Sequence, residues 1–200
     1  MTPIEHLQSA DPIIAAVIQK IGPLETSRDS QDHFRALCRI IVGQQLSVAV
    51  ARAIWNRVEA HFGPNFSPDA VLKTSENELR TLGLSGAKAR YLLALATHIG
   101  EGKLQIERLE SLPDEEIVRE IVAVKGLGPW SADMFLMFHL GRPDILPVGD
   151  LGIREAIKRL YNLENRPDAA QMTQIAAPWR PFRTLASRYL WKSLDTNAEI

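Results

Sequence analysis

Apolar residues recur at helical spacing along nearly the whole chain. Ile14, Val17 and Ile18 lie one, three or four residues apart, and similar stripes return in most later segments. The alternation of apolar and polar residues that is typical of strands is nearly absent. The pattern therefore predicts an all-α fold of about ten helices joined by short loops. The predicted helices begin after Asp11, at Phe34, after Ser47, at Pro68, after Ser75 and near Tyr91, and then span residues 114–122, 130–140, 150–160, 168–176 and 181–193.

Residues at the ends of the apolar stripes agree with helix boundaries. Asp11 followed by Pro12 suits an N-cap and a first helical position. Ser75, with Glu78 three residues later, matches a capping box, in which each side chain binds the other residue's backbone N–H. Glycines such as Gly43 end the stripes. The helical prediction thus rests on spacing and on caps together.

Composition and cysteine content narrow the class of protein. The chain has 200 residues, 46% of them apolar, which suits one domain or two small lobes sharing a cleft. Its one cysteine, Cys38, lies in an apolar run and is interpreted as a core residue. A single cysteine excludes an internal disulfide and a four-cysteine zinc or iron–sulfur site. The five histidines show no ligand spacing, so no metal site is predicted.

Charge is unevenly distributed although the net charge is only −1. Residues 101–120 hold seven acidic and three basic side chains, whereas residues 142–192 hold nine basic and five acidic ones. The C-terminal part is therefore the one that could face phosphates, with ordinary surface charge as the alternative. The N-terminus lacks a signal-peptide pattern, and no apolar run is long enough to span a bilayer. These features predict an intracellular protein with no membrane partner.

A glycine-rich turn precedes the helical run that begins at Trp130. Gly126, Leu127, Gly128 and Pro129 form this predicted hairpin. Glycines permit backbone conformations that side chains obstruct, and Pro129 suits the first turn of a helix. Backbone N–H groups at such a helix start bind phosphate, and the hairpin carbonyls could hold a cation. An ordinary connection between two helices is the alternative.

An isolated carboxylate, Asp150, follows Gly128 by 22 residues, at the predicted start of another helix. A carboxylate in that place is usually an N-cap. Its neighbours Pro147, Val148 and Gly149 are small or apolar and could leave it in a cleft. There it could stabilise a cationic sugar or activate water. Capping and catalysis are compatible roles.

Two further groups of residues are candidates for binding a nucleotide. Trp130 follows the hairpin directly and Trp191 lies near the C-terminus, and together they could form a stacking pocket for a base. Trp55 is interpreted as core. The turn Gly43–Ser47 places two glutamines, Gln44 and Gln45, between helices, where packing does not need them. These residues could fill the gap left by a nucleotide that has left the duplex, and a solvated polar turn is the alternative.

In combination these segments resemble the helix–hairpin–helix superfamily of DNA glycosylases, and in particular its alkylation-specific branch, DNA-3-methyladenine glycosylase II. The resemblance runs from about Phe34 to Trp191. Four segments match in order: IVGQQLSVAVARAIW, LGLSGAKARYLLALA, VKGLGPWSADMFLM and LPVGDLGIREAI. They correspond to the early helix pair with its intercalating turn, the next helix, the hairpin, and the segment with the essential aspartate. Any one match is weak, but four at suitable spacing are specific.

The resemblance implies two helical lobes flanking a DNA-binding cleft, within one compact glycosylase unit over residues 1–200. One lobe covers about 35–140 and includes the hairpin, and the other combines the N-terminal helix with residues 150–200. The implied partner is double-stranded DNA with alkylated bases, bound by a monomer. The implied location is the cytoplasm or nucleoid in a bacterium and the nucleus in a eukaryote.

The resemblance also assigns roles to residues of this chain. Asp150 is the catalytic residue, and Trp130 with Trp191 forms the base pocket. The DNA-binding residues are Gly126, Gly128, Ser131, Gln44, Gln45 and Leu46. Flipping the damaged nucleotide out of the stack costs a few kcal/mol, and the turn at Gln44 would fill the vacated space. The implied reaction is hydrolysis of the N-glycosidic bond of 3-methyladenine or 7-methylguanine, which leaves an abasic site.

One departure from the family bears on the mechanism. Members that also cut the DNA backbone carry a lysine just after the hairpin, where this chain has Trp130. A Schiff base through that position is therefore excluded, and a monofunctional enzyme without a cofactor is predicted. The alternatives are a non-catalytic hairpin module that binds DNA and a helical scaffold with no nucleic-acid role. The lesion spectrum, a cation at the hairpin and the identity of the intercalating residue stay open.

Overall fold

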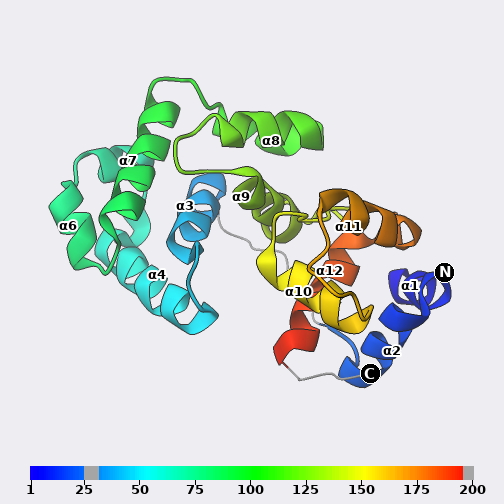
Figure 1. Cartoon of the computed structure of the whole chain (residues 1–200). Helices are drawn as coiled ribbons and strands as arrows, with labels where there is room; N and C mark the ends of the chain where they lie inside the picture. Colours follow the sequence, from blue (N-terminus) through cyan, green and yellow to red (C-terminus); the bar gives the residue numbers. More distant parts are fainter. Residues whose placement is uncertain (25–31, 196–200) are drawn as a thin grey trace. The chain divides into compact units, whose positions relative to one another are not determined.

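The computed structural model describes residues 1–24 and 32–195, and every regular element within these ranges is a helix (Figure 1). The prediction of an all-α fold is confirmed. The α-helices are α1 (Pro3–Ala10), α2 (Pro12–Ile21), α3 (His33–Gly43), α4 (Val48–Phe62), α5 (Pro68–Leu72), α6 (Glu76–Thr81), α7 (Gly86–Gly100), α8 (Asp114–Val122), α9 (Pro129–Met134), α10 (Leu151–Leu160), α11 (Ala169–Ile175) and α12 (Arg183–Asp195). Short 3-10 helices lie at Gly63–Asn65, Ile106–Ser111 and Ala177–Trp179.

The described residues divide by their contacts into two units. Residues 32–135, here called the hairpin unit, form one of them. Residues 1–24 and 136–195, here called the terminal unit, form the other, so that α1 and α2 belong to the same unit as α10, α11 and α12 (blue and orange to red in Figure 1). The resemblance places the boundary between lobes near residue 140, whereas the contacts divide the chain after Phe135.

Side-chain caps set the helix boundaries much as the sequence predicts. Asp11 caps α2 and Ser47 caps α4, and Ser75 with Glu78 forms a complete capping box at α6. Asp150 accepts from the backbone N–H of Ile153 as the N-cap of α10. These caps are local signals, which explains why sequence alone locates them.

Two elements differ from the prediction. The apolar pattern predicts no helix before Asp11, yet α1 is present, and Thr2 with Glu5 gives it a capping box. That threonine–glutamate spacing is itself a sequence signal for a helix start. The predicted helix 130–140 is not uniform, because α9 is followed by a π-helical stretch, Phe135–His139. Such wider turns occur mostly as single insertions in helices and are frequent at functional sites.

The core of the hairpin unit is built around α7, which packs against α3, α5 and α6. Cys38 and Trp55 are buried in this unit, as predicted. Burial raises the pKa of the Cys38 thiol, and the nearby Asp32 carboxylate acts in the same direction. The thiol is therefore protonated at neutral pH and serves as a small apolar core group.

The terminal unit is held together by a buried carboxylate as well as by its apolar core. Asp11 is only 7% exposed. It accepts hydrogen bonds from the hydroxyl of Tyr161 at 2.5 Å and the indole N–H of Trp179 at 2.8 Å, besides two backbone N–H groups of α2. A buried charge is tolerated only when such donors replace water. Asp11 therefore joins the N-terminal helices to the ends of α10 and of Ala177–Trp179.

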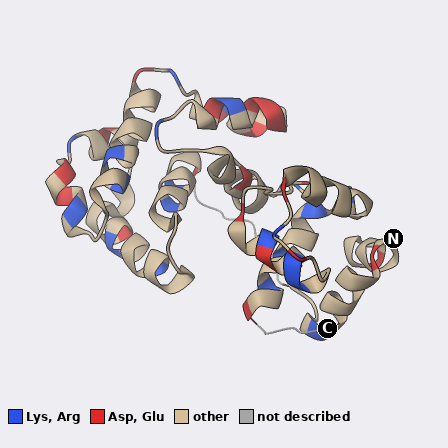
Figure 2. Ribbon diagram, in the orientation of Figure 1, with Lys and Arg blue, Asp and Glu red and all other residues tan. Residues whose placement is uncertain are grey.

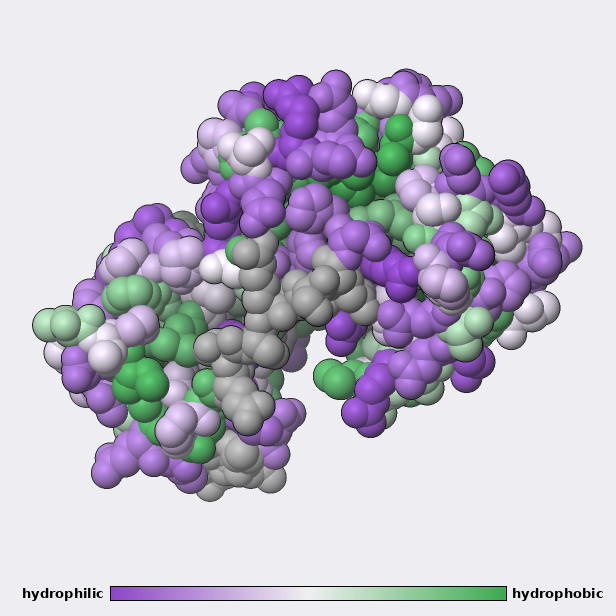
Figure 3. Space-filling model, turned by 180° about the vertical axis from the view of Figure 1, so that it is seen from behind, coloured by the Kyte–Doolittle hydropathy of each residue, from purple (hydrophilic) through white to green (hydrophobic). Residues whose placement is uncertain are grey.

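The surface drawn in Figure 3 is mainly hydrophilic, with separate hydrophobic patches. Of the helices in residues 1–24 and 32–195, none is both long and apolar enough to cross a bilayer. In the same ranges no three His, Cys, Asp or Glu side chains gather in a way that could hold a metal ion.

Candidate nucleic-acid interface and active site

The predicted hairpin joins α8 to α9 in the hairpin unit. Gly126 has a φ of 96°, and the N–H of Leu127 donates to the carbonyl of Val124 at 3.0 Å, which closes the turn. Leu127 is buried and anchors the turn in the core. Gly128 is the N-cap of α9, where no side chain caps the helix start. Pro129 contributes no N–H to this helix start, and the N–H of Ser131 donates to the carbonyl of Gly128 at 2.9 Å.

The two glycines of the hairpin have different surroundings. A Cβ atom added at Gly126 would lie 2.1 Å from the ring of Tyr91 on α7, so the turn rests directly against that ring. A Cβ atom added at Gly128 would meet nothing within 4 Å, and its φ is −113°. Gly126 is therefore required by the fold, whereas the fold alone does not require glycine at position 128.

The turn that follows α3 is bound to the same hairpin. The side-chain amide of Gln44 donates to the carbonyl of Gly126 at 2.9 Å and to the hydroxyl of Ser131 at 3.1 Å. Ser131 is 1% exposed, so its hydroxyl lies inside the unit. Gln45 and Leu46 are exposed, and Gln45 has a positive φ of 55°. The structure thus separates two inward-directed residues, Gln44 and Ser131, from two exposed ones.

A lysine supports the same turn from α7. The ammonium group of Lys88 donates to the carbonyl of Val42 at 2.8 Å, in the last turn of α3. Burial lowers the pKa of Lys88 from its ordinary value. A cation is favourable at the C-terminal end of a helix, where the carbonyl groups lack partners. Lys88 therefore fixes the end of α3, from which the turn departs.

Asp150 in the terminal unit is held by two hydrogen bonds to one oxygen. Its Oδ1 accepts from the backbone N–H of Ile153 at 2.8 Å and from the indole Nε1–H of Trp191 at 2.8 Å. Trp191 belongs to α12, and the indole bond spans 41 residues of sequence. The carboxylate is half-buried. Two donors on one oxygen fix the orientation of the carboxylate group.

A glycine in the first turn of α10 makes room for this pair. A Cβ atom at Gly152 would lie 3.1 Å from Oδ1 of Asp150 and 3.2 Å from Cδ1 of Trp191. Both distances are shorter than ordinary carbon contacts. Glycine is a poor helix former, at roughly 1 kcal/mol worse than alanine. The close approach of Trp191 to Asp150 explains why position 152 holds a glycine in spite of this cost.

The ring of Trp191 is also stacked on a second aromatic ring. Phe138, in the π-helical stretch, has its ring centroid 5.8 Å from that of Trp191, and the two ring planes are 29° apart. The guanidinium of Arg188 lies 5.7 Å from the centroid of Phe138. The sequence predicts no role for Phe138, Arg188 or Gly152. The spacing of Arg188 and Trp191, three residues apart on one helix, is the signal that could have linked them.

The two predicted tryptophans belong to different units. Trp130 is half-buried at the start of α9 in the hairpin unit, and Trp191 lies in the terminal unit. A shared base pocket formed by both rings stays a prediction. For Trp191 the structure shows a different contact, since its indole N–H donates to the carboxylate of Asp150, the predicted catalytic residue.

Several basic residues of the C-terminal part are used within the terminal unit. Arg180 and Arg183 both pair with Asp144, at 2.9 and 2.6 Å. Arg159 and Arg166 both bind Glu155, whose pKa is lowered chiefly by the hydrogen bond from Arg166. The positive excess of residues 142–192 therefore overstates the charge available for phosphates.

A group of acidic residues in the hairpin unit lies on α8. Asp114, Glu115 and Glu116 occupy its first turn (red in Figure 2), where negative charge interacts favourably with the helix dipole.

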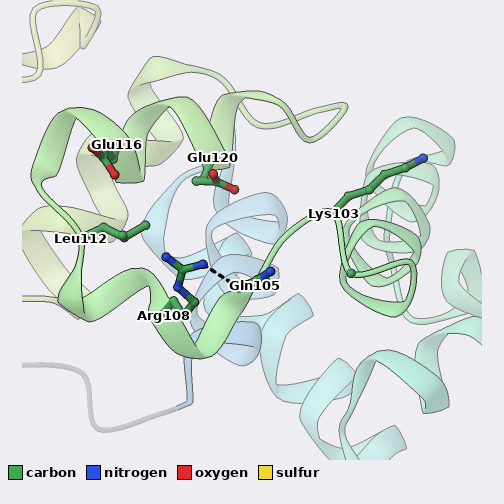
Figure 4. A pocket seen from close by; sticks show the side chains of 7 residues that line it. Lys103, Gln105, Arg108, Leu112, Glu116 and Glu120 are labelled. Atoms are coloured by element: carbon green, nitrogen blue, oxygen red, sulfur yellow. Dashed lines mark hydrogen bonds between the residues drawn. The ribbon is translucent and has the colours of Figure 1, made fainter.

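A polar pocket of about 150 Å³ lies in the hairpin unit beside α8. Figure 4 shows Glu116 and Glu120 at one side and Arg108, hydrogen-bonded to Gln105, at another. None of the predicted site residues lines this pocket. It is a feature of the surface next to the acidic helix and is unrelated to the hairpin contacts described above.

Two helices, α8 and α9, joined by a glycine hairpin and followed by the aspartate that caps α10 define a class of protein. The chain belongs to the HhH-GPD superfamily of base excision DNA repair proteins, whose family model matches residues 38–181. The family recognised from the sequence is thereby confirmed.

Individual relatives agree with this assignment. The chain is 31% identical over 169 residues to YfjP of Bacillus subtilis, covering 81% of this chain and 59% of that protein's length. It is 29% identical to DNA-3-methyladenine glycosylase 1 of Schizosaccharomyces pombe, covering 94% of this chain and 85% of the relative. The structure of the S. pombe 3-methyladenine DNA glycosylase Mag1 in complex with abasic DNA matches with a TM-score of 0.88 and 28% identity, covering 98% of this chain and 97% of that one.

A bacterial structure is also similar. A DNA-3-methyladenine glycosidase from Bacillus halodurans matches with a TM-score of 0.80 and 32% identity, covering 99% of this chain and 91% of that one.

Proposed function

We propose that the protein is a monofunctional DNA glycosylase that removes alkylated purines, such as 3-methyladenine and 7-methylguanine, from double-stranded DNA. The observation that carries this proposal is Asp150, a helix N-cap whose carboxylate is fixed by the indole of Trp191. The family assignment and the glycosylases among its relatives support it. The products are the free base and an abasic site.

The proposed reaction begins with flipping of the damaged nucleotide out of the duplex. The glycosidic bond is inaccessible within the stack, and extrusion costs a few kcal/mol. The hairpin binds the DNA backbone through its own backbone N–H groups, with Gly128 allowing a phosphate to approach. The turn at Gln45 and Leu46 fills the vacated space.

Asp150 acts on the sugar once the nucleotide has been flipped. Methylation of a purine ring nitrogen makes the base cationic and a good leaving group. As the glycosidic bond breaks, positive charge develops on the sugar, and the fixed carboxylate stabilises it and orients the attacking water. No proton has to be supplied to a base that leaves as a neutral molecule.

Trp130 has two consequences in this proposal. It stands where bifunctional relatives carry lysine, so the chain has no amine there to form a Schiff base. Its ring, with that of Trp191, stacks on the cationic base, a contact worth about 0.5–2 kcal/mol. Selectivity then comes mostly from the lability of the damaged bond, and several lesions are substrates.

The remaining parts of the proposal concern partners and location. The enzyme acts as a monomer, without a cofactor, in the compartment that holds the DNA: the cytoplasm or nucleoid of a bacterium or the nucleus of a eukaryote. A structural cation could lie at the hairpin carbonyls. Two hairpin carbonyls already accept hydrogen bonds, that of Gly126 from Gln44 and that of Gly128 from the N–H groups of Ser131 and Ala132.

The base-release assay tests the proposed function. Duplex DNA methylated with a simple alkylating agent is incubated with the protein, and the free bases are separated by chromatography. We expect 3-methyladenine to be released fastest and 7-methylguanine more slowly. Release of neither base, with salt-sensitive DNA binding intact, contradicts the proposal and favours a non-catalytic binding module.

Replacing Trp191 with phenylalanine tests the hydrogen bond to Asp150. Trp191→Phe keeps an aromatic ring but removes the indole donor. Hydrogen bonds to charged groups contribute about 1.5–3 kcal/mol, so we expect base release to slow by about tenfold to a hundredfold while DNA affinity is unchanged. Single-turnover rates and equilibrium binding measure the two quantities. An unchanged rate would show that the indole N–H does not position the carboxylate.

Gly152→Ala disturbs the same pair from the other side, because its Cβ would press on both Asp150 and Trp191. The rate of base release should fall by about tenfold, the effect of a displaced carboxylate in a preorganised site. Gly149→Ala is the matched control, since a Cβ there meets nothing within 4 Å. Equal rates for the two variants would rule out the tight fit as a functional requirement.

A further inference from the structure

The side chain of Gln44 connects two segments that are far apart in sequence. Its amide donates to the carbonyl of Gly126, before the bend of the hairpin, and to the hydroxyl of Ser131, after it. The two bonds span 82 and 87 residues. Ser131 is 1% exposed, so the amide reaches into the interior of the hairpin unit. Both partners lie in the same unit as the turn.

We propose that Gln44 is a positioning residue that couples the hairpin to the segment entering the duplex, which we call the wedge and assign to Gln45 and Leu46. This inference rests on the proposed function. Gln45 and Leu46 are exposed, Leu46 by 38%, and both lie directly after the anchored residue. The side-chain amide of Gln44 binds the carbonyl of Gly126 in the hairpin and the hydroxyl of Ser131. In this proposal Gln44 and Ser131 act by positioning the turn rather than by contacting DNA.

The surrounding contacts make the turn suitable for this role. Lys88 binds the carbonyl of Val42 just before the turn, and Ser47 caps α4 just after it. Between these two anchors, the bonds from Gln44 fix the turn to the hairpin that binds the backbone. The distance from the bound phosphate to the inserted wedge is thereby set before DNA arrives. Ordering a loop in advance reduces the free-energy cost of inserting it.

Coupling through the wedge predicts an effect that depends on how the lesion is paired. Gln44→Met keeps the length of the side chain and removes both donors. For 7-methylguanine opposite cytosine, we expect base release to slow by about tenfold, the effect of two lost neutral hydrogen bonds. Opposite an abasic-site analogue the nucleotide is already poorly stacked, and flipping is less costly. The rate there should fall by less than about threefold by the same reasoning.

The comparison is made within each variant, so a smaller folded fraction cancels from the ratio of the two rates. Ser131→Ala removes one of the two acceptors and should give a smaller effect of the same kind. Gln105→Met is the matched control, because Gln105 is exposed and binds Arg108 in the same unit. It should leave both rates unchanged.

A double-mutant cycle separates coupling from a general loss of structure. The wedge is removed by Gln45→Ala with Leu46→Ala, and Gln44→Met is then added. If Gln44 acts through the wedge, the added change has no further effect on the rate. A full additional tenfold loss would overturn the proposal, as would equal losses on the paired and unpaired lesions. Base release at the normal rate by Gln44→Met contradicts the coupling alone, whereas a wild-type protein that releases no base contradicts the proposed function as well.

Discussion

Replacing Asp150 with asparagine is expected to slow base release by about a thousandfold while DNA binding survives. At ~4 Å and an effective dielectric constant of about 20, two unit charges attract by about 4 kcal/mol, which corresponds to that factor in rate. Asparagine retains a carbonyl oxygen that can accept from Ile153 and Trp191, so the cap and the fold should persist. Single-turnover release of 7-methylguanine and equilibrium binding to the same duplex provide the two measurements.

A second N-cap of the terminal unit supplies the control for this change. Asp168 caps α11 and takes part in a capping box, so Asp168→Asn makes the same chemical substitution at a similar structural position. It should leave base release at the wild-type rate. If Asp150→Asn releases base at the normal rate, Asp150 is only a helix cap and its catalytic assignment is wrong.

Gly126→Ala is expected to destabilise the protein strongly, whereas Gly128→Ala is not. Alanine at position 126 must adopt a left-handed φ, which costs roughly 1–2 kcal/mol, and its Cβ would collide with Tyr91, which adds about 1–3 kcal/mol. Together these correspond to a fall in melting temperature of roughly 5–15 °C for a chain of this size. Thermal unfolding followed by circular dichroism measures the change.

The two glycines then separate stability from DNA binding. Gly128→Ala should unfold at the wild-type temperature, since its Cβ meets no protein atom within 4 Å. If a phosphate lies against this backbone, the added methyl group should weaken DNA binding by roughly tenfold, about the effect of one lost charge-assisted hydrogen bond. Adding Tyr91→Leu to the Gly126→Ala variant removes the ring that the new Cβ would strike, so the double variant should recover part of the lost stability. A stable Gly126→Ala protein would contradict the close packing of the hairpin on α7.

The helices could be predicted from the sequence because their signals are local. Asp11, Ser47 and Ser75 lie within a few residues of the N–H groups that they cap. The helix α1 carries such a signal too, in Thr2 and Glu5, although no long apolar stripe accompanies it. The π-helical stretch after α9 has no comparable signature, since the same apolar residues would fit a regular helix.

The contacts that define the site could not be predicted, because they join residues distant in sequence. The order of hairpin and Asp150 indicates a glycosylase, but the indole bond from Trp191 depends on how α12 packs beside α10. In the same way Gln44 has the sequence context of a DNA-contacting residue, and only the fold places its amide against Gly126 and Ser131.

Ion pairing also limits what charge composition can predict. The excess of basic residues after Arg142 indicates a phosphate-binding surface, yet Asp144 and Glu155 each bind two of the arginines. Counting charges along a segment does not reveal which of them neutralise one another in three dimensions.

Strand cleavage of a duplex with a single 7-methylguanine is the most direct test of hydrolysis that depends on Asp150. The labelled strand is analysed after incubation with wild-type protein or Asp150→Asn, both with and without an endonuclease that cuts only at abasic sites, because hot alkali would also break the strand at untreated 7-methylguanine. We predict that the wild-type protein leaves the strand intact, that the endonuclease then cuts it at the lesion, and that the variant produces no such site. A wild-type reaction without an endonuclease-sensitive site, or a strand already broken before the endonuclease is added, would contradict a monofunctional glycosylase.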